Sequence, residues 1–254
     1  MPMPGGSREN EILKLLMSQR SKTVTVKQIC SHCFISESSA RRDLHKLEQA
    51  GLIKRVHGGA RLISVEDVYK TDNAEDSGIG GKVADEVVSL VSDGFAIFLD
   101  SSAISCSIVP LLQNFDDITV ITPNIKAVTL LSKYPAVRTI CVCGVVQNEL
   151  LSASGSYAEN FIDNFNVDLA FVCGSGFDTN AGLSDVSMNE ANIKKKMLSR
   201  AKKRVIACPS DRIGSVSRYL ICDTKGFDTL ITDSKLTPEK AESLMAERIS
   251  FRCV

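Results

Sequence analysis

Three absences limit what this chain can be. It has no apolar run long enough to cross a bilayer, and no segment has the form of a secretory signal. Residues 1–6 are too few to form a targeting segment. The nine cysteines are odd in number and follow no signal, so we expect free thiols rather than a disulfide framework. These absences predict a cytoplasmic protein without a membrane partner.

Histidine is also scarce, and none lies beyond residue 57. The three histidines are His32, His45 and His57. Acid–base chemistry in the long remainder of the chain would therefore depend on carboxylates such as Asp100, Asp178 and Asp185. This scarcity weighs against an enzyme, and we predict that the protein is not one.

The net charge is zero, but the two parts of the chain differ in sign. Residues 1–62 hold 11 Lys and Arg against 5 Asp and Glu, a net charge of +6. Residues 63–254 hold 19 against 25, a net charge of −6. A basic N-terminal part predicts that this part alone binds a polyanion such as nucleic acid.

Residues 36–44, Ser-Glu-Ser-Ser-Ala-Arg-Arg-Asp-Leu, carry the clearest pattern of the basic part. As a helix they place Ala40, Leu44 and Leu47 on one stripe, at spacings of four and three residues. The opposite face is formed by Ser38, Arg41, Arg42 and His45. Such a helix suits the major groove of DNA, where arginine can bind guanine with two hydrogen bonds. Taken alone, the pattern fits a solvated helix face equally well.

A second helix and a turn precede this one. Thr25-Val-Lys-Gln28 has the form of a capping box and predicts a helix start at Thr25. A break at Phe34–Ile35 follows, and Ser36 is expected to cap the next helix, which Gly51 ends. We therefore predict a helix-turn-helix over about residues 24–43.

Residues 52–62 predict a β-hairpin. Two short strand-like runs flank Gly58–Gly59, which would supply the turn. Three helices followed by a hairpin make the winged form of the helix-turn-helix, and residues 7–62 have the size of such a domain. The cationic side chains of the hairpin are Lys54, Arg55, His57 and Arg61.

Cys30-Ser-His-Cys33 is half of a zinc-ligand pattern. A structural zinc site needs four ligands, and no second pair of cysteines lies nearby in the sequence. On a helix, Cys30 and Cys33 share the inward face with Ile29. We predict that both thiols pack in the core, and that the protein has no metal and no cofactor.

Residues Thr25–Ala60 resemble the DNA-binding domain of the DeoR family of bacterial transcription regulators. The resemblance depends on the order and spacing of the motifs Ser36, Ser39, Arg41-Arg-Asp-Leu44, Leu47-Glu48, Gly51-Leu52 and Arg55-Val-His-Gly-Gly-Ala60. Two residues depart from the family pattern, because Phe34 replaces a small turn residue and Ala40 replaces a larger aliphatic one. We expect both departures to bear on turn geometry and local packing more than on DNA contact.

The resemblance and the helix geometry together assign the DNA contacts. Ser38, Arg41, Arg42 and His45 are expected to face the groove. Ser36 and Ser39 are expected to cap the helix or to bind phosphate at its N-terminus. Phosphate contacts without sequence selectivity are expected from Lys27, Lys54, Arg55 and His57, and Lys46 is also expected to bind DNA. Asp43 would repel phosphate, so we expect it to pair internally with a basic residue.

Residues 63–80 are polar and predict a flexible or partly helical linker. In residues 81–254, short apolar runs alternate with helical stretches. Strands are predicted at 95–99, 119–122, 139–143, 169–173, 204–207 and 229–232, and helices at 83–90, 125–133, 191–202 and 238–247. This alternation predicts an α/β domain whose sheet is covered on both faces.

Ligands of such sheets bind beyond the carboxyl ends of the strands, and those ends are polar here. The polar segments are 100–105, 122–124, 174–178, 182–184 and 208–212, and the third strand ends at Gly144. Each segment alone is a weak signal, because strand ends often form turns rich in Gly, Ser and Asp. Together they predict a ligand pocket, and the Ser-rich segment 100–105 suits a phosphate.

Residues 81–235 resemble, more loosely, the effector domain of the same family, which is similar in fold to pentose-phosphate isomerases and coenzyme A transferases. The resemblance implies a phosphorylated sugar or related metabolite as effector. The binding residues that the resemblance implies are Asp100, Ser101, Ser102, Thr122, Asn124, Gly174, Asp178, Glu190 and Lys194. Gly144 and Arg212, at the ends of two predicted strands, are added to them. In one loop, Pro209-Ser-Asp-Arg212 stands where the family usually has Asp-Ser-Ser-Lys, and this departure is the basis for a vestigial pocket as an alternative.

Two short basic runs, Lys194–Lys196 and Lys202–Arg204, are expected to be solvated helix faces. An anion contact through Lys194 is the alternative.

We predict a DNA-binding transcriptional regulator of carbohydrate metabolism genes, a repressor, that a phosphorylated sugar controls. Its partners would be double-stranded operator DNA and that effector. A helix-turn-helix needs a twofold partner to reach two half-sites, so we expect a homodimer or homotetramer. One alternative is a DNA-binding regulator with a vestigial pocket, and a less favoured one is an enzyme of the sugar-phosphate isomerase type.

Overall fold

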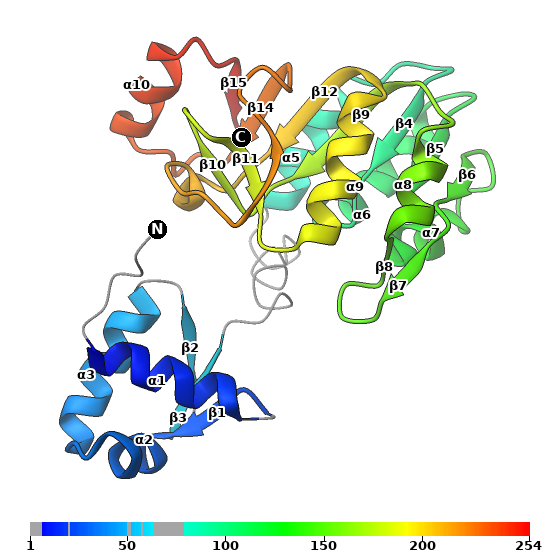
Figure 1. Cartoon of the computed structure of the whole chain (residues 1–254). Helices are drawn as coiled ribbons and strands as arrows, with labels where there is room; N and C mark the ends of the chain where they lie inside the picture. The colour runs from blue at the N-terminus through cyan, green and yellow to red at the C-terminus, as the bar shows by residue number, and fades with distance from the viewer. Residues whose placement is uncertain (1–6, 20, 50–51, 57, 63–78) are drawn as a thin grey trace. The chain divides into compact units, whose positions relative to one another are not determined.

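The structure is a computed structural model, and it describes residues 7–19, 21–49, 52–56, 58–62 and 79–254. The chain divides into two compact units, Met1–Asp67 and Val68–Val254, whose elements are labelled in Figure 1. The predicted linker over 63–80 lies outside the described residues except for 79–80, which begin helix α5 (Ile79–Val88). No helix of the described residues is long and apolar enough to cross a bilayer.

In its described residues, the smaller unit combines three helices with a small antiparallel sheet of order β1-β3-β2. Its elements are α1 (Ser7–Ser18), β1 (Thr23–Thr25), α2 (Val26–Cys33), α3 (Glu37–Gln49), β2 (Ile53–Val56) and β3 (Gly59–Leu62). The predicted helix-turn-helix and hairpin are confirmed. Strand β1 is not predicted by the sequence pattern, and it extends the hairpin into a sheet by pairing with β3.

A small apolar core joins these helices to the sheet. Helix α3 contributes Ala40, Leu44 and Leu47, each at most 2% exposed, as the predicted stripe requires. The other buried members are Ile12, Leu13, Leu16, Val24, Val26, Ile29, Ile53 and Ala60. Cys30 and Cys33 are half-buried and pack against this core, as predicted for both thiols.

Both ends of α2 are set by local hydrogen bonds. The Thr25 hydroxyl accepts from the Gln28 N–H at 3.2 Å, and Gln28 Oε1 accepts from the Thr25 N–H at 2.8 Å, so the capping box is confirmed. Phe34 ends the helix in the left-handed conformation, with φ +53°. The expectation that Phe34 bears on local packing is wrong, because this turn presents Ile35 to the core and leaves the Phe34 ring 93% exposed.

The predicted turn at Gly58–Gly59 is only partly right, because Gly59 is the first residue of β3 and pairs with Val56, so that of the two glycines only Gly58 lies in the turn. Gly58 has φ +76°, a conformation that residues with side chains rarely adopt. A Cβ on Gly59 would lie 2.1 Å from the carbonyl oxygen of Val24, so β1 pairs closely with β3 only when residue 59 has no side chain. His57 and the expected helix stop at Gly51 lie outside the described residues.

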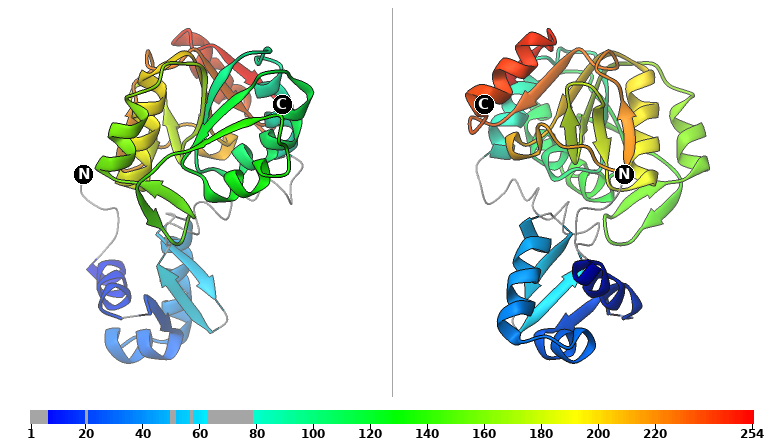
Figure 2. Two further views of the ribbon diagram at one scale, coloured as in Figure 1. Left: turned by 90° about the vertical axis from the view of Figure 1, so that its right-hand side faces the viewer. Right: turned by 60° about the vertical axis from the view of Figure 1, so that its left-hand side comes forward.

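The larger unit is built on a seven-stranded parallel sheet with helices on both faces, seen from further sides in Figure 2. The strands, in their order across the sheet, are β15 (Phe251–Cys253), β14 (Thr229–Thr232), β12 (Ala201–Ala207), β9 (Val167–Cys173), β4 (Ala96–Leu99), β5 (Thr119–Thr122) and β6 (Arg138–Cys141). The predicted α/β fold with a sheet covered on both faces is confirmed.

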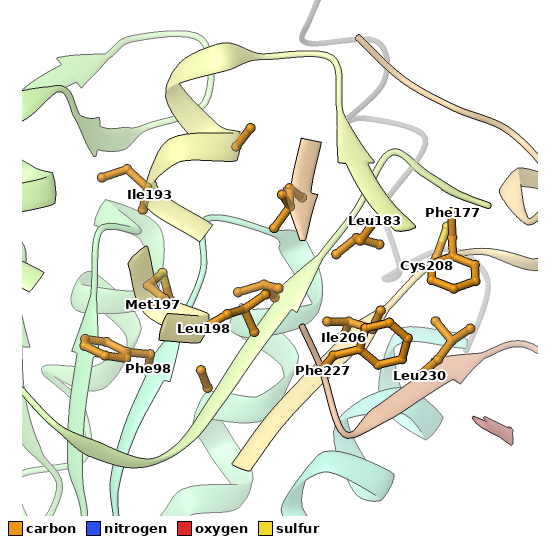
Figure 3. Packing of buried hydrophobic residues seen from close by; sticks show 14 of the residues in the cluster. Phe98, Phe177, Leu183, Ile193, Met197, Leu198, Ile206, Cys208, Phe227 and Leu230 are labelled. Atoms are coloured by element: carbon orange, nitrogen blue, oxygen red, sulfur yellow. The ribbon is translucent and has the colours of Figure 1, made fainter. Parts of the chain in front are cut away.

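Alternate residues of β4 face the two helical layers. Ile97 and Leu99 pack with one layer, and Phe98 packs with the other, where Figure 3 shows it near Met197 of α9. The first layer holds α5, α6 (Ala103–Ile108), the 3-10 helix η1 (Val109–Asn114) and α7 (Ile125–Leu131). The second holds α8 (Ser156–Ile162), α9 (Met188–Ser199) and α10 (Pro238–Ala246).

Two smaller sheets stand beside the main one. β7 (Val145–Gln147) and β8 (Ser152–Ser154) form a hairpin, and β10 (Gly176–Asp178), β11 (Gly182–Asp185) and β13 (Tyr219–Cys222) form an antiparallel sheet. The 3-10 helix η2 (Ser210–Arg212) follows β12. The sequence pattern misses these strands because they are short and most of them, unlike the equally short β4 and β14, contain no continuous apolar run.

The C-terminal end of the predicted helix over 191–202 is wrong. Helix α9 stops at Ser199, and β12 begins at Ala201 because residues 201–207 pair in parallel with β9 from Val167 onward. The basic run Lys202–Arg204 therefore lies on a strand and not on a solvated helix face.

Candidate nucleic-acid interface and effector site

The outer face of α3 carries the predicted polar side chains. Ser38, Arg41, Arg42 and His45 are exposed, opposite the buried stripe of the same helix. Arg41 Nη2 lies 3.3 Å from Glu37 Oε2, in an ion pair whose two side chains are both more than half exposed. Such an exposed pair is weak, so Arg41 can exchange Glu37 for another anion at little cost.

Three hydroxyl groups cluster at the N-terminus of α3. Ser36 Oγ accepts from the N–H of Ser39 at 3.3 Å, so Ser36 caps the helix as predicted. The same oxygen lies 2.9 Å from Ser38 Oγ and 3.0 Å from Ser39 Oγ. Ser36 and Ser38 are exposed, and Ser39 is half-buried. Hydroxyls beside a helix N-terminus favour an anion such as a phosphate.

Two ion pairs fix α3 to α1. Arg8 Nε and Nη2 donate to the two carboxylate oxygens of Asp43 at 2.6 and 2.9 Å. Asp43 is buried, so the prediction of an internal pair is confirmed, although the sequence pattern did not identify Arg8 as the partner. Lys46 Nζ lies 3.2 Å from Glu9 Oε1, so this lysine contacts α1 while its side chain remains mostly exposed.

The remaining predicted cations lie on α2 and the hairpin. Lys54 and Arg55 are exposed on β2, and Lys27 is exposed near the start of α2. Glu48 Oε1 accepts from the backbone N–H of Arg55 at 3.1 Å, which fixes β2 to the end of α3. His57 lies outside the described residues. Exposed cations are therefore found on α2, α3 and β2 of one small unit.

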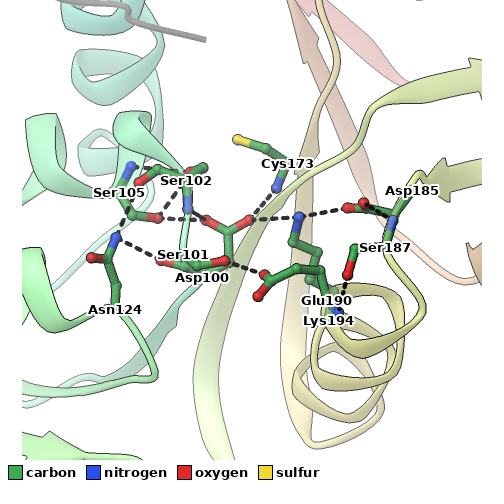
Figure 4. Close-up of polar contacts among 10 residues, drawn as sticks. All are labelled: Asp100, Ser101, Ser102, Ser105, Asn124, Cys173, Asp185, Ser187, Glu190 and Lys194. Atoms are coloured by element: carbon green, nitrogen blue, oxygen red, sulfur yellow. Dashed lines mark hydrogen bonds and ion pairs between the residues drawn. The ribbon is translucent and has the colours of Figure 1, made fainter. Parts of the chain in front are cut away.

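In the larger unit, a buried carboxylate follows the carboxyl end of β4 (Figure 4). Asp100 Oδ1 accepts from the N–H of Ser102 at 3.0 Å and from Ser105 Oγ at 2.7 Å. Its Oδ2 accepts from the N–H of Cys173 at 2.7 Å. Because Cys173 ends β9, Asp100 connects the ends of two neighbouring strands and shapes the loop that follows β4.

Lys194 reaches this carboxylate from α9. Its Nζ lies 2.8 Å from Asp185 Oδ2 and 3.7 Å from Asp100 Oδ2, and none of the three side chains is exposed. Asp185 ends β11, and its other oxygen accepts from the N–H of Ser187 at 2.9 Å. The expectation that Lys194 lies on a solvated helix face is wrong, because α9 turns this side toward two buried acids. Lys194 is an internal counter-ion of the loop after β4.

Glu190 lies one turn before Lys194 on α9. The Ser101 hydroxyl donates to Glu190 Oε2, and no group among the described residues makes a hydrogen bond to Oε1. Glu190 is fully buried, and this burial raises its pKa above that of an ordinary glutamate. Because no described group makes a hydrogen bond to Glu190 Oε1, this oxygen and the nearby Ser101 hydroxyl can form hydrogen bonds with a small polar ligand.

Asn124, two residues after the end of β5, holds the same loop. Its Nδ2 donates to the carbonyl oxygens of Ser102 at 3.2 Å and Asp100 at 3.4 Å. Its Oδ1 accepts from the N–H of Ala127 at 3.1 Å and so caps α7. Thr122 Oγ1 accepts from the N–H of Asn124 at 3.1 Å, and both side chains are buried. These polar groups therefore position the loops at the strand ends.

Two of the predicted glycines allow close packing. A Cβ on Gly144 would lie 2.7 Å from the carbonyl oxygen of Ser154, and one on Gly174 would lie 2.3 Å from Leu183 Cδ1. Each glycine thus has a local packing role that explains its presence without a ligand.

Asp178 and Arg212 lie on other elements. Asp178 Oδ1 accepts from the N–H groups of Asn180 and Ala181 at 2.8 and 3.0 Å, which shapes the turn between β10 and β11. Arg212 is half-buried on η2. Neither residue belongs to the cluster drawn in Figure 4.

The structure brings several predicted effector residues together in one polar cluster. These are Asp100, Ser101, Ser102, Asn124, Glu190 and Lys194, with Thr122 attached through Asn124. The sequence analysis included Ser105 only as part of the segment 100–105, and it missed Ser187 and the pairing of Asp185 with Lys194. Ser102-x-x-Ser105 and Ser187-x-x-Glu190 both have the spacing of a helix cap, and that signal could have found the two serines.

A winged helix-turn-helix in one unit, and a parallel α/β fold with a buried polar cluster in the other, define the class of DNA-binding regulators with a separate sensor domain. Family profiles agree: one described as "DeoR C terminal sensor domain" matches residues 81–234, and one described as "DeoR-like helix-turn-helix domain" matches residues 8–66. The chain belongs to the DeoR family of transcriptional regulators.

Individual relatives support this assignment. The chain is 31% identical to the HTH-type transcriptional regulator GolR of Listeria innocua, over 90% of this chain and 91% of that one. It is 30% identical to the HTH-type transcriptional repressor GlcR of Bacillus subtilis, over 83% and 82% of the two chains. A solved ribose 5-phosphate isomerase of Methanocaldococcus jannaschii aligns with a TM-score of 0.40 and 18% identity, over 54% of this chain and 55% of that one, too low to bear on function.

Proposed function

We propose that this transcriptional regulator represses genes of carbohydrate metabolism by binding operator DNA through α3 and the β2–β3 hairpin, and that a phosphorylated sugar controls this binding. The outer face of α3 carries the proposal, because its exposed polar side chains stand opposite a buried apolar stripe. A helix of this kind fits the major groove while its back packs on the unit that presents it.

In this proposal α3 lies in the groove with its N-terminal half nearest the bases. Arg41 and Arg42 bind base edges, and Arg42 can hold a guanine with two hydrogen bonds, while Ser38 and His45 contact the neighbouring bases. Contacts to the phosphates come from Lys27, Ser36, Ser39, Lys46, Lys54, Arg55 and His57. These contacts set affinity and position rather than sequence preference.

The effector is proposed to bind at the polar cluster after β4. Ser101 and Glu190 are the direct contacts, since Ser101 is half-buried and Glu190 Oε1 makes no hydrogen bond with the described residues. Asp100 and Lys194 support the loop after β4 from inside the protein, because both are fully buried and form an ion pair with each other. Arg212 is proposed as a phosphate contact, because guanidinium binds phosphate with parallel hydrogen bonds.

Control of DNA binding is proposed to act through an oligomer. A helix-turn-helix dimer places two recognition helices about one turn of DNA apart, so we propose a homodimer or a homotetramer. A ligand that binds one arrangement of subunits more tightly than another shifts the population toward it. The sugar phosphate would in this way change the spacing of the two recognition helices.

Two experiments test the two halves of the proposal separately. Selection of duplexes from a random-sequence library by the purified chain should yield one preferred sequence with twofold symmetry. A thermal-shift panel of sugar phosphates, with the free sugars and inorganic phosphate as controls, should find a compound that stabilises the protein by about 2.7 kcal/mol at a hundred times its Kd. Selection without enrichment contradicts the DNA half. A panel without a stabilising compound contradicts the effector half and favours a vestigial pocket.

A further inference from the structure

Phe34 is the most exposed large hydrophobic side chain among the residues that the structure describes. Its side chain is 93% exposed, against 75% for Tyr157, the next in order. It lies in the turn between α2 and α3, two residues before Ser36, which caps α3. An aromatic ring in this position removes no apolar surface from water within the protein.

The backbone of Phe34 adds a second unfavourable feature. Its φ of +53° and ψ of +47° are left-handed, where a side chain crowds the following carbonyl oxygen. The N–H groups of Phe34 and Ile35 both donate to the Cys30 carbonyl, so the turn is held in this form. Glycine at position 34 would remove both unfavourable features. The folding of this unit therefore gives no reason for a phenylalanine here.

The surroundings of the ring indicate which kind of partner covers it. The exposed neighbours in the chain are Ser31, His32, Ser36, Glu37 and Ser38, and none of them extends an apolar patch. A protein partner that buried the ring would also bury these polar groups. DNA differs, because its polar phosphates alternate with apolar deoxyribose faces and, in the major groove, with thymine methyl groups.

We propose that the Phe34 ring packs against apolar surface of the DNA at the edge of the major groove, either a deoxyribose face or a thymine methyl group. This inference rests on the proposed function, since it requires α3 to lie in the groove. The turn leads directly into the N-terminus of α3, which is the end of a recognition helix that meets the bases. Phe34 thereby adds an apolar contact to the polar contacts of α3.

The test uses the full chain and the duplex that it selects from a random-sequence library. Phe34→Gly removes the ring and the strain together, so this variant should unfold at the same temperature as the wild type or higher. Its Kd for the selected duplex should rise about tenfold, because partial burial of a phenylalanine is worth about that factor. Phe34→Tyr keeps the ring and should keep the wild-type Kd. Met17→Ala, which removes another exposed apolar side chain, is the matched control and should not change the Kd.

Replacing each thymine of the duplex by uracil distinguishes the two apolar surfaces. If uracil at one position weakens binding of the wild type but not of Phe34→Gly, the ring contacts the methyl group of that thymine. If Phe34→Gly binds the duplex more weakly but no uracil position has this effect, the ring contacts deoxyribose. An unchanged Kd for a folded Phe34→Gly overturns the inference, whether or not its sedimentation shows a change of assembly. Failure of the wild-type chain to select any sequence would instead overturn the proposed function.

Discussion

The ammonium group of Lys194 lies 2.8 Å from Asp185 Oδ2, and neither side chain is exposed to solvent. Asp100 adds a second carboxylate at 3.7 Å. Lys194→Met would leave two buried acids without a counter-ion, so it should lower the free energy of unfolding of the larger unit by about 3–5 kcal/mol. Amide hydrogen exchange in β9 measures this unit separately from the smaller one. Lys195→Met, at the exposed neighbour, should change it by less than about 0.5 kcal/mol. Equal effects of the two substitutions would contradict the role given to Lys194.

Glu190→Gln should stabilise the larger unit increasingly as the pH rises. Burial raises the pKa of Glu190 in the folded protein above the value of 4.5 for an ordinary glutamate. Below that value both folded and unfolded chains hold the proton, so the carboxyl makes no pH-dependent difference. Between the ordinary and the raised pKa only the unfolded chain releases the proton, so wild-type stability falls with rising pH. Glutamine does not titrate. The other titrating groups contribute equally to the pH dependence of both proteins, so their contributions cancel in the difference.

Denaturant unfolding of both proteins from pH 4 upward measures this difference. The advantage of Glu190→Gln should grow above about pH 4.5 and become constant once the pH passes the raised pKa. A difference that stays the same at every pH would show that Glu190 titrates as an ordinary glutamate. Loss of the hydrogen bond from Ser101 would add a constant term, which does not affect the slope.

Much of the fold follows from local sequence signals. Strands such as β4 and β9 are buried on both faces, so their apolar runs stand out against their neighbours. The capping box at Thr25 and the serine cap at Ser36 give helix starts directly. The short strand β1 could not be predicted, because its pairing depends on Gly59, far along the chain, coming within contact of Val24.

The site was less predictable than the fold. Ser101 and Glu190 lie 89 residues apart in sequence, and their contact depends on how α9 packs over the sheet. Lys194 stands in a run of three lysines, and only the packing of α9 distinguishes it from exposed Lys195. The resemblance to a family placed these residues in one site, but residue patterns alone carry no information on which lysine is buried.

Gly59→Ala should destabilise the smaller unit, because the new Cβ would lie 2.1 Å from the carbonyl oxygen of Val24. Either β1 separates from β3 or the turn opens, at an expected loss of about 1–3 kcal/mol. Gly81→Ala is the control, since a Cβ there meets nothing within 4 Å and the residue lies in helix α5, where alanine is preferred. Hydrogen exchange in β3 should report the loss for Gly59→Ala alone. Full protection of β3 in that variant would show that the strands tolerate a side chain at position 59.

Arg55→Ala should weaken binding to every duplex by a similar factor. Arg55 is exposed on β2 and is proposed to contact a phosphate, so its removal releases about one counter-ion fewer on binding. The slope of log Kd against log salt should decrease by about one. Titrations of the selected duplex and of an unrelated duplex at several salt concentrations measure both effects. A loss confined to the selected duplex would instead make Arg55 a base contact.

Arg42→Ala should reduce affinity for the selected duplex much more than affinity for an unrelated one. Arg42 is exposed on the outer face of α3, and a lost bidentate contact to guanine is worth roughly 1–3 kcal/mol, or about 5- to 150-fold in Kd. Lys14→Ala removes the same charge from an exposed position on α1 and should leave the ratio of the two affinities unchanged. Because Arg42 lies outside the core, both variants should unfold at the wild-type temperature. If Arg42→Ala lowered the two affinities equally, Arg42 would be a phosphate contact, and base recognition by α3 would have to depend on Arg41 and the neighbouring serine and histidine.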